Sequence, residues 1–253
     1  MTTENDSVCN HRRYAVCLPS WGSIHEAAKN GSLEDVRYYI SHGVDVNLKQ
    51  GSDYGSAPVH LAVAKKSNIQ LLEYLIQIGA NVNAKDGEGW TSLHKAILGN
   101  ADIAVLKQLV GNGAEVDAMN DDGCTALHCA AAKETGTDAL KFLITQHADV
   151  NARDNDGWTP LHFAAYDNAN IKVLRILIDN GADVNAQDDM NQTPLHLAAS
   201  TNSNPQVVKY LLENGADVKA EDEMGLTPYD VADCDEKKAI LRGSSRKYFT
   251  QRR

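Results

Sequence analysis

One histidine recurs along this chain at an almost constant interval. The first step is 35 residues and each of the next four is 34 residues. A further step of 34 residues lands on Asp230, in the related sequence TPYD. The recurring positions are His25, His60, His94, His128, His162 and His196. Such a register requires a repeated structural unit, so the chain should fold as a linear array in which each unit contacts its neighbours.

The residues around the histidine predict the start of a helix in each unit. A threonine lies three residues before it, where its hydroxyl is expected to accept a hydrogen bond from a free backbone N–H. Pro160 and Pro194 come next, in the first helical turn, where the missing N–H costs nothing. The small pair Ala164-Ala165 then allows a neighbouring helix to approach closely. The threonines are Thr91, Thr125, Thr159 and Thr193.

A second helix follows in each unit. Val173, Leu174 and Leu177 illustrate its apolar stripe, which is expected to face the core. Glycine ends this helix in most units, because a left-handed residue closes the last turn. His147 takes the place of that glycine in the fourth unit, which predicts either local strain or an altered turn. The glycines are Gly43, Gly79, Gly113, Gly181 and Gly215.

Through TPLH and GADVNA, this unit resembles the ankyrin repeat. The resemblance implies an all-α solenoid of stacked helix-turn-helix units with projecting β-turn hairpins, made of six full repeats and a truncated C-terminal capping repeat. The period of 34 exceeds the usual ankyrin period by one residue, which lies between the helices. We expect an N-terminal extension at 1–20, a single repeat domain at 21–242 and a basic tail at 243–253. The repeats are placed at about 22–56, 57–90, 91–124, 125–158, 159–192, 193–226 and 227–242.

Charge is distributed unevenly. The net charge is -10, yet residues 237–253 hold seven basic residues and no acid, which leaves -17 on the remainder. An acidic body disfavours nucleic acid and favours a basic or mixed-charge protein segment as partner. No apolar stretch is long enough for a membrane span, and no secretory signal is evident. The five cysteines lack C-x-x-C spacing, so we expect a cytoplasmic protein.

Catalytic and metal-binding patterns are missing from the sequence. The histidines lie one repeat apart and are therefore interpreted as framework residues that bond the backbone between repeats. His25-Glu26 begins like a zinc-binding helix, but Lys29 stands where the second ligand would be. Cys124 and Cys129 lie near a helix start, which can lower a thiol pKa, although a buried inert role is favoured. We predict no enzyme activity, catalytic residue, metal, cofactor or small-molecule substrate.

Positions not needed by the framework are the candidates for partner binding. Each tryptophan lies four residues before a repeat histidine, at a hairpin tip, where a rigid aromatic side chain favours binding. The alternative is that the tryptophans only pack on the neighbouring hairpin. Other tip and first-helix residues complete the set. The candidates are Trp21, Tyr54, Glu88, Trp90, Asp122, Trp158, Tyr166, Met190 and Gln192.

We therefore predict a monomeric protein–protein interaction module, acting as a scaffold, adaptor or inhibitor. A regulatory or targeting subunit of an enzyme complex is the alternative, with the basic tail contacting membrane or nucleic acid. The period and the Asn-rich inter-helix turns also resemble ankyrin proteins of bacteria and large viruses, which would imply delivery into a host cell. That last reading rests on analogy between folds.

Overall fold

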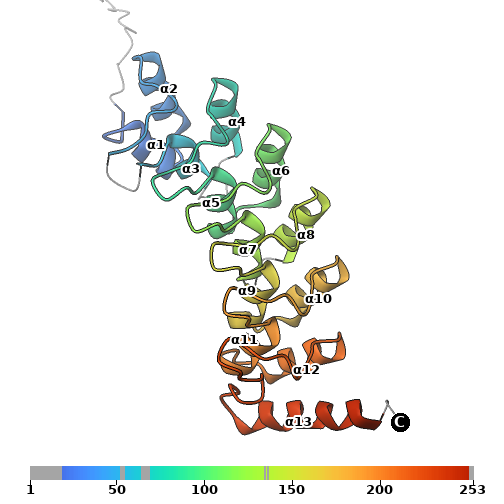
Figure 1. Ribbon diagram of the computed structural model, residues 1–253. Coiled ribbons are helices and arrows are strands. Elements are labelled where there is room, and N and C mark those ends of the chain that lie inside the picture. Colours follow the sequence, from blue (N-terminus) through green and yellow to red (C-terminus); the bar gives the residue numbers. More distant parts are fainter. Residues whose placement is uncertain (1–18, 52–54, 64–68, 134, 136, 251–253) are drawn as a thin grey trace, which may run out of the picture.

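The computed structural model is a curved stack of helical hairpins (Figure 1). It describes residues 19–51, 55–63, 69–133, 135 and 137–250, which contain no β-strand. None of their helices combines the length and apolar character needed to cross a membrane. The first helices of successive hairpins are α1 (Ile24–Asn30), α3 (Pro58–Ala62), α5 (Ser92–Leu98), α7 (Ala126–Ala131), α9 (Pro160–Asp167) and α11 (Pro194–Ser200). The second helices are α2 (Leu33–Ser41), α4 (Ile69–Gln77), α6 (Ile103–Gly111), α8 (Thr137–Thr145), α10 (Ile171–Asp179) and α12 (Pro205–Glu213), and α13 (Asp235–Thr250) ends the stack.

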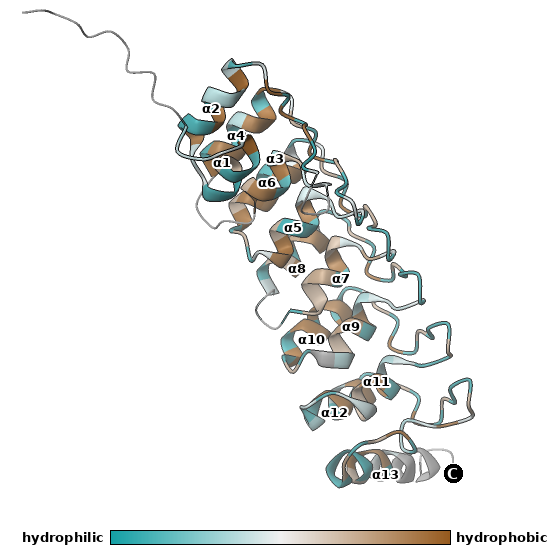
Figure 2. Ribbon diagram, turned by 90° about the vertical axis from the view of Figure 1, so that its left-hand side faces the viewer, coloured by the Kyte–Doolittle hydropathy of each residue, from teal (hydrophilic) through white to brown (hydrophobic). Residues whose placement is uncertain are grey.

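Two layers of helices enclose a continuous apolar core (Figure 2). In the fifth repeat, Leu161 and Ala165 of the first helix and Leu174 and Leu177 of the second are fully buried. The small alanines keep the first-helix layer thin, so that neighbouring hairpins approach closely. Each hairpin is thus buried mainly by the hairpins before and after it.

The recurring histidine links each repeat to the next. In His94, Nδ1 lies 3.2 Å from the backbone N of Thr91 and 2.9 Å from its Oγ1. Nε2 lies 3.0 Å from the carbonyl O of Cys124, the last residue of the hairpin tip that leads into the following repeat. Since a carbonyl can only accept, Nε2 carries the proton and Nδ1 accepts from both Thr91 groups. The predicted role of the threonine hydroxyl is therefore corrected, because it donates to histidine.

The same outward bond is made throughout the array. His25 and His60 lie 2.8 Å from the carbonyls of Leu48 and Ala84, and the later histidines repeat the His94 pattern. The interpretation of these histidines as framework residues is confirmed. Burial lowers the pKa of five of these histidines, because the charged ring would lose its hydration. The pKa is lowered to about 4 in His94 and is lowered also in His60, His128, His162 and His196.

Asparagine side chains form a second link, at the ends of the second helices. Asn83 Nδ2 donates to the carbonyl of Gly113 at 2.8 Å, and its Oδ1 accepts from the N–H of Glu115 at 2.9 Å. Asn47, Asn151 and Asn185 make equivalent pairs of bonds. Each asparagine therefore ties its own repeat to the closing turn of the next one.

This link is incomplete between the third and fourth repeats. Asp117 replaces the asparagine, and its Oδ1 still accepts from Asp149 N at 3.1 Å. A carboxylate cannot donate to the carbonyl of His147, which replaces the glycine. His147 keeps the left-handed conformation, with φ of 64°, and Ala148 N still bonds to Leu143 O at 3.1 Å. Of the two outcomes predicted for His147, local strain is the one observed. A residue other than glycine takes the left-handed conformation here, and the turn itself is unchanged.

The seventh repeat departs from the others. Asp230 replaces the histidine, and its Oδ2 accepts from both N and Oγ1 of Thr227, at 2.9 and 2.6 Å. An acceptor without a second nitrogen is sufficient here, because α13 rather than another hairpin tip follows these turns. Turns replace the first helix of this repeat, and α13 continues across the boundary that we predicted between 242 and 243. Acids in its first turn and basic residues further along favour a helix of this length.

Acidification should weaken the array. The unfolded histidine pKa is about 6.5, above the folded values, so stability is complete above pH 6.5 and falls as the pH drops toward 4. Each titrating histidine should contribute up to about 1.4 kcal/mol per pH unit. Urea unfolding between pH 7.5 and 5 measures this slope. In His94→Gln, the slope of the unfolding free energy against pH should be smaller by the contribution of about one histidine. An unchanged slope would contradict the lowered pKa of His94.

Restoring the missing asparagine should stabilise the stack. Asp117→Asn supplies a donor for the carbonyl of His147, so we expect a gain of about 0.5 to 1 kcal/mol. Asn83→Asp is the matched control, which removes the donor at an equivalent junction and should destabilise by a similar amount. Urea midpoints at pH 7 give both values, and the account fails if the two substitutions change stability in the same direction.

Candidate partner-binding face

Hairpin tips project from the first-helix side of the stack (Figure 1). The described tips are the turns 86–90, 120–124, 154–158, 188–192 and 222–226, each closed by a backbone bond between its ends. In one of them, Asp154 Oδ1 accepts from Asp156 N at 3.0 Å and Trp158 N at 2.8 Å. The other tips use Asp86, Asn120, Asp188 and Asp222 in the same way. The carboxylate or amide oxygen thus holds each turn in one conformation.

Backbone bonds also join each tip to the next. Asp121 N donates to Glu88 O at 3.1 Å, and Asn155 N donates to Asp122 O at 3.0 Å. The series continues to the last tip, where Glu223 N donates to Met190 O at 2.9 Å. These bonds make the tips one continuous surface. We call the exposed surface of these turns, together with the exposed ends of the adjoining first helices, the tip face.

The tryptophans have different environments. Trp158 is half-buried, with its ring centroid 5.3 Å from that of Phe163 and 5.3 Å from that of Tyr166. Trp90 is also half-buried, with its ring edge-on to His94 at 5.5 Å. Trp21 is 37% exposed, and its carbonyl accepts a hydrogen bond from the hydroxyl of Tyr39. Trp90 and Trp158 therefore pack on neighbouring rings, as the packing alternative predicts, and each also leaves part of its side chain exposed.

The remaining candidates that the structure describes lie along the tip face. Glu88 and Asp122 are exposed at consecutive tips, and Met190 is 63% exposed at a later one. Tyr166 is 43% exposed at the end of α9. Gln192 is half-buried, and its carbonyl accepts from Nε2 of His162 at 3.1 Å. Tyr54 lies outside the described residues.

Sequence reasoning missed the apolar residues beyond Met190. Met224 is 81% exposed at the last tip, and Leu226 beside it is 37% exposed. Met224 lies 34 residues after Met190, so the repeat register itself carried the signal. The two methionines occupy equivalent positions on adjacent tips. They form an exposed apolar strip at the C-terminal half of the tip face.

Acidic side chains surround this strip. Arg153, next to the tip 154–158, is paired with Asp189 at 2.9 Å. At the third repeat, burial alone would raise the pKa of Asp86, but Lys95 at 2.8 Å and backbone N–H groups hold that pKa below its usual value. The exposed tip acids are Glu88, Asp121, Asp122, Asp156, Asp189, Glu221 and Glu223. Apart from Asp189, which is paired with Arg153, these acids have no ion-pair partner among the described residues, so negative charge predominates on the tip face.

The cysteines near the tips are poor nucleophiles. Burial, with the nearby Asp154 carboxylate, raises the pKa of Cys124 to about 12. Burial also raises the pKa of Cys129 to about 12. Both thiols therefore stay protonated at neutral pH, which agrees with the favoured prediction that these cysteines are buried and unreactive. Within the described ranges, no three His, Cys, Asp or Glu side chains are grouped so as to hold a metal ion.

Stacked helical hairpins with a row of projecting tips define a helical-repeat protein. The family described as ankyrin repeats (3 copies) matches residues 24–106, 99–188, 131–222 and 168–241. The chain therefore belongs to the ankyrin-repeat family, and the predicted all-α ankyrin solenoid is confirmed. Ankyrin repeats generally mediate protein–protein interaction.

Solved structures and curated proteins agree with this assignment. The human ASB11 ankyrin repeat domain superposes with a TM-score of 0.75 and 25% identity, covering 88% of this chain and 97% of that one. The ankyrin repeat domain of Bcl-3 gives a TM-score of 0.69 and 27% identity, with coverage of 88% and 99%. Palmitoyltransferase ZDHHC13 of Mus musculus is 38% identical over 71 residues, which are 28% of this chain and 11% of that protein. Potassium channel AKT1 of Arabidopsis thaliana is 37% identical over 65 residues, or 26% and 7%. The chain thus spans about a tenth of the length of these curated relatives.

Substitutions should separate packing from exposure on this face. Trp158→Ala removes ring contacts with Phe163 and Tyr166, so we expect a loss of about 2 kcal/mol. Met190→Ser with Met224→Ser removes exposed side chains and should change stability by less than about 0.5 kcal/mol. Urea unfolding followed by circular dichroism gives both values. Equal losses for the two variants would show that the methionines are structural.

Proposed function

We propose that this protein is an interaction module, a scaffold, adaptor or inhibitor, that binds a partner protein on its tip face. The observation that carries the proposal is the exposed strip of Met190 and Met224, which lies on adjacent rigid tips among exposed acidic residues. Large exposed apolar side chains within a polar rim are typical of interfaces. The partner segment is basic or of mixed charge, because the acidic surroundings attract it and repel acidic surfaces. We place the protein in the cytoplasm as a monomer.

The candidate residues Trp21, Glu88, Trp90, Asp122, Trp158, Tyr166, Met190 and Gln192 remain part of this proposal, and Met224 and Leu226 extend it. Half-buried Trp90 and Trp158 present one edge each and are anchored by their own repeats, so ordering them on binding costs little. The exposed methionines adapt their shape to the partner. We therefore assign the tryptophans a rigid contact surface and the methionines the adaptable part.

A second candidate is a regulatory or targeting subunit of an enzyme complex. The matches to palmitoyltransferases and to a potassium channel support it, because each covers only a short repeat segment of a much longer protein. The basic residues toward the end of α13 would then contact membrane or nucleic acid. Delivery into a host cell is a further proposal, supported by the Asn-rich inter-helix turns that include Asn168 and Asn202.

Affinity capture from lysate of the cells that produce the protein tests the first proposal. The bait is the full chain, and the test variant is Met190→Ser with Met224→Ser, which should lose the captured partner. Leu48→Ser is the matched control, since Leu48 is also an exposed apolar residue but lies in the first repeat, far along the chain from both methionines. Capture retained by the test variant, or lost equally by the control, would place the binding surface elsewhere.

A further inference from the structure

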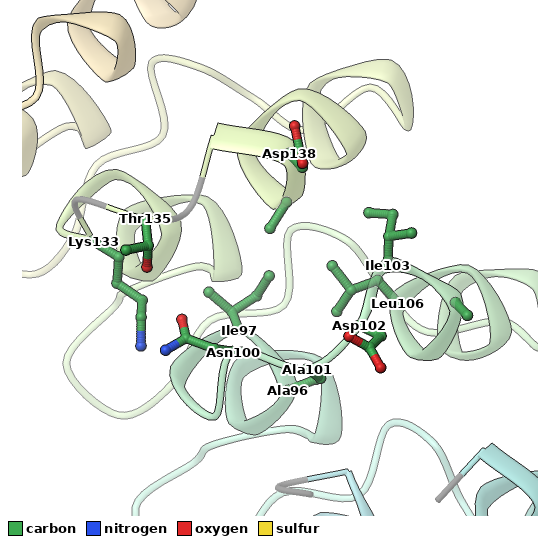
Figure 3. A pocket seen from close by; sticks show the side chains of 12 residues that line it. Ala96, Ile97, Asn100, Ala101, Asp102, Ile103, Leu106, Lys133, Thr135 and Asp138 are labelled. Atoms are coloured by element: carbon green, nitrogen blue, oxygen red, sulfur yellow. The ribbon is translucent and has the colours of Figure 1, made fainter. Parts of the chain in front are cut away.

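A cleft of about 720 Å³ opens between the third and fourth repeats, on the side of the inter-helix turns. It is lined by the end of α5, the start of α6 and the start of α8 (Figure 3). In that view, Ile97 lies between Lys133 and Thr135 on one side and Ile103 on the other. Clefts of roughly 300 to 1,000 Å³ are large enough to hold a small ligand or a few side chains. This cleft lies on a different edge of the stack from the tip face.

Polar residues at this cleft do not make the bonds of their counterparts in later repeats. Asn168 and Asn202 are buried, and each donates at 2.8 Å to a carbonyl of the preceding repeat, that of Ala131 or Ala165. Asn100 occupies the same place in the third repeat, six residues after the histidine. It is exposed instead, has φ of 52°, and lines the cleft. Its side chain is therefore available to a ligand.

Asp102 shows the same change of role. It stands immediately before α6, where Asn170 and Asn204 cap the equivalent helices α10 and α12 through their side chains. Asp102 makes no such cap bond. It is exposed and lines the cleft, as does Asp138 in the first turn of α8. Neither carboxylate has an ion-pair partner within the part of the chain that the structure describes, so both can receive a cation.

Among the described residues of the lining, the basic side chain is that of Lys133, and it is already hydrogen-bonded to a backbone carbonyl. Lys133 Nζ donates to the carbonyl O of Leu98 at 2.6 Å. Apolar side chains form the remainder of the lining, with Ile97 buried, Ile103 38% exposed and Ala104 exposed. The cleft thus combines an aliphatic surface with two carboxylates and an amide. Lysine and arginine match it chemically, because each has an apolar stem that ends in a cation.

We propose that this cleft is a second docking site, which takes a lysine- or arginine-bearing extended segment of a partner protein. Separate cationic heads of the segment pair with Asp102 and with Asp138, which lie apart on different sides of the lining (Figure 3). The aliphatic stems lie along Ile97 and Ile103, and the Asn100 amide bonds the backbone of the segment. The site is independent of the tip face, so the two could hold two partners, or two segments of one partner, at the same time.

Titration of the isotope-labelled full chain with a defined probe tests the proposal by NMR. The probe is an N-acetylated hexapeptide of alternating lysine and alanine, and the same peptide with glutamate in place of lysine is its control. The lysine peptide should give saturable shifts at the amides of 97–104 and 137–139, and the glutamate peptide should give none. Shifts confined to the hairpin tips, or no saturable binding, would overturn the proposal.

Variants separate the cleft from general acidity. Asp102→Asn with Asp138→Asn should weaken binding at the cleft amides by about five- to tenfold, the range for two exposed charge pairs. Glu73→Gln with Asp179→Asn makes the same change in net charge at exposed positions on α4 and α10, and should leave the affinity unchanged.

Ala104→Trp tests the cleft without altering charge. Ala104 is exposed, so the larger side chain should fill the cleft and abolish the cleft shifts, while shifts at the tips remain. Equal effects of both charge pairs, or unaffected binding to Ala104→Trp, would overturn the proposal. Because Met190→Ser with Met224→Ser should not affect the cleft, failure at the tip face and failure here are distinguishable.

Discussion

The hydrogen bond from histidine Nε2 to the segment that leads into the next repeat is the interaction on which the stack depends. A single repeat buries too few apolar side chains to offset the conformational entropy of about 34 residues. A neutral imidazole joins neighbours because it accepts on one nitrogen and donates on the other. Asp230 illustrates the requirement from the opposite case, since it keeps only the accepting half in the repeat whose turns lead into α13.

Because some residues hold the stack together, function is left to the positions outside that framework. Histidine, asparagine and the tip aspartates are committed to backbone groups in nearly every repeat, and the small helix residues are buried. Residues outside those positions vary from repeat to repeat without altering the stack. Exposed Met190 and Met224 and the tip acids are of that kind. The surface is therefore variable in chemistry while its geometry is held constant.

Sequence reasoning found the fold because the framework residues are few, periodic and chemically distinctive. It misjudged the threonine hydroxyl, since a capping threonine normally accepts, and here Nδ1 of His94 needs a donor. It placed a boundary inside α13, at Gly243, where a helix commonly ends, yet α13 continues to Thr250. The candidate site was only partly accessible, because the exposure of Trp158 depends on Phe163 and Tyr166, which meet it only once the repeat has folded.

Departures from the repeat pattern concentrate at the third repeat and its junction with the fourth. Asp117 gives up a donor, Asn100 turns outward, and Asp102 leaves its helix uncapped. Each change removes a bond that other repeats keep, so each has a cost in stability. The apolar core and the histidine bonds continue through the repeats on both sides and hold the third in place. A linear stack can thus release polar groups for binding in its interior, where both neighbours compensate, more readily than at its ends, where only one does.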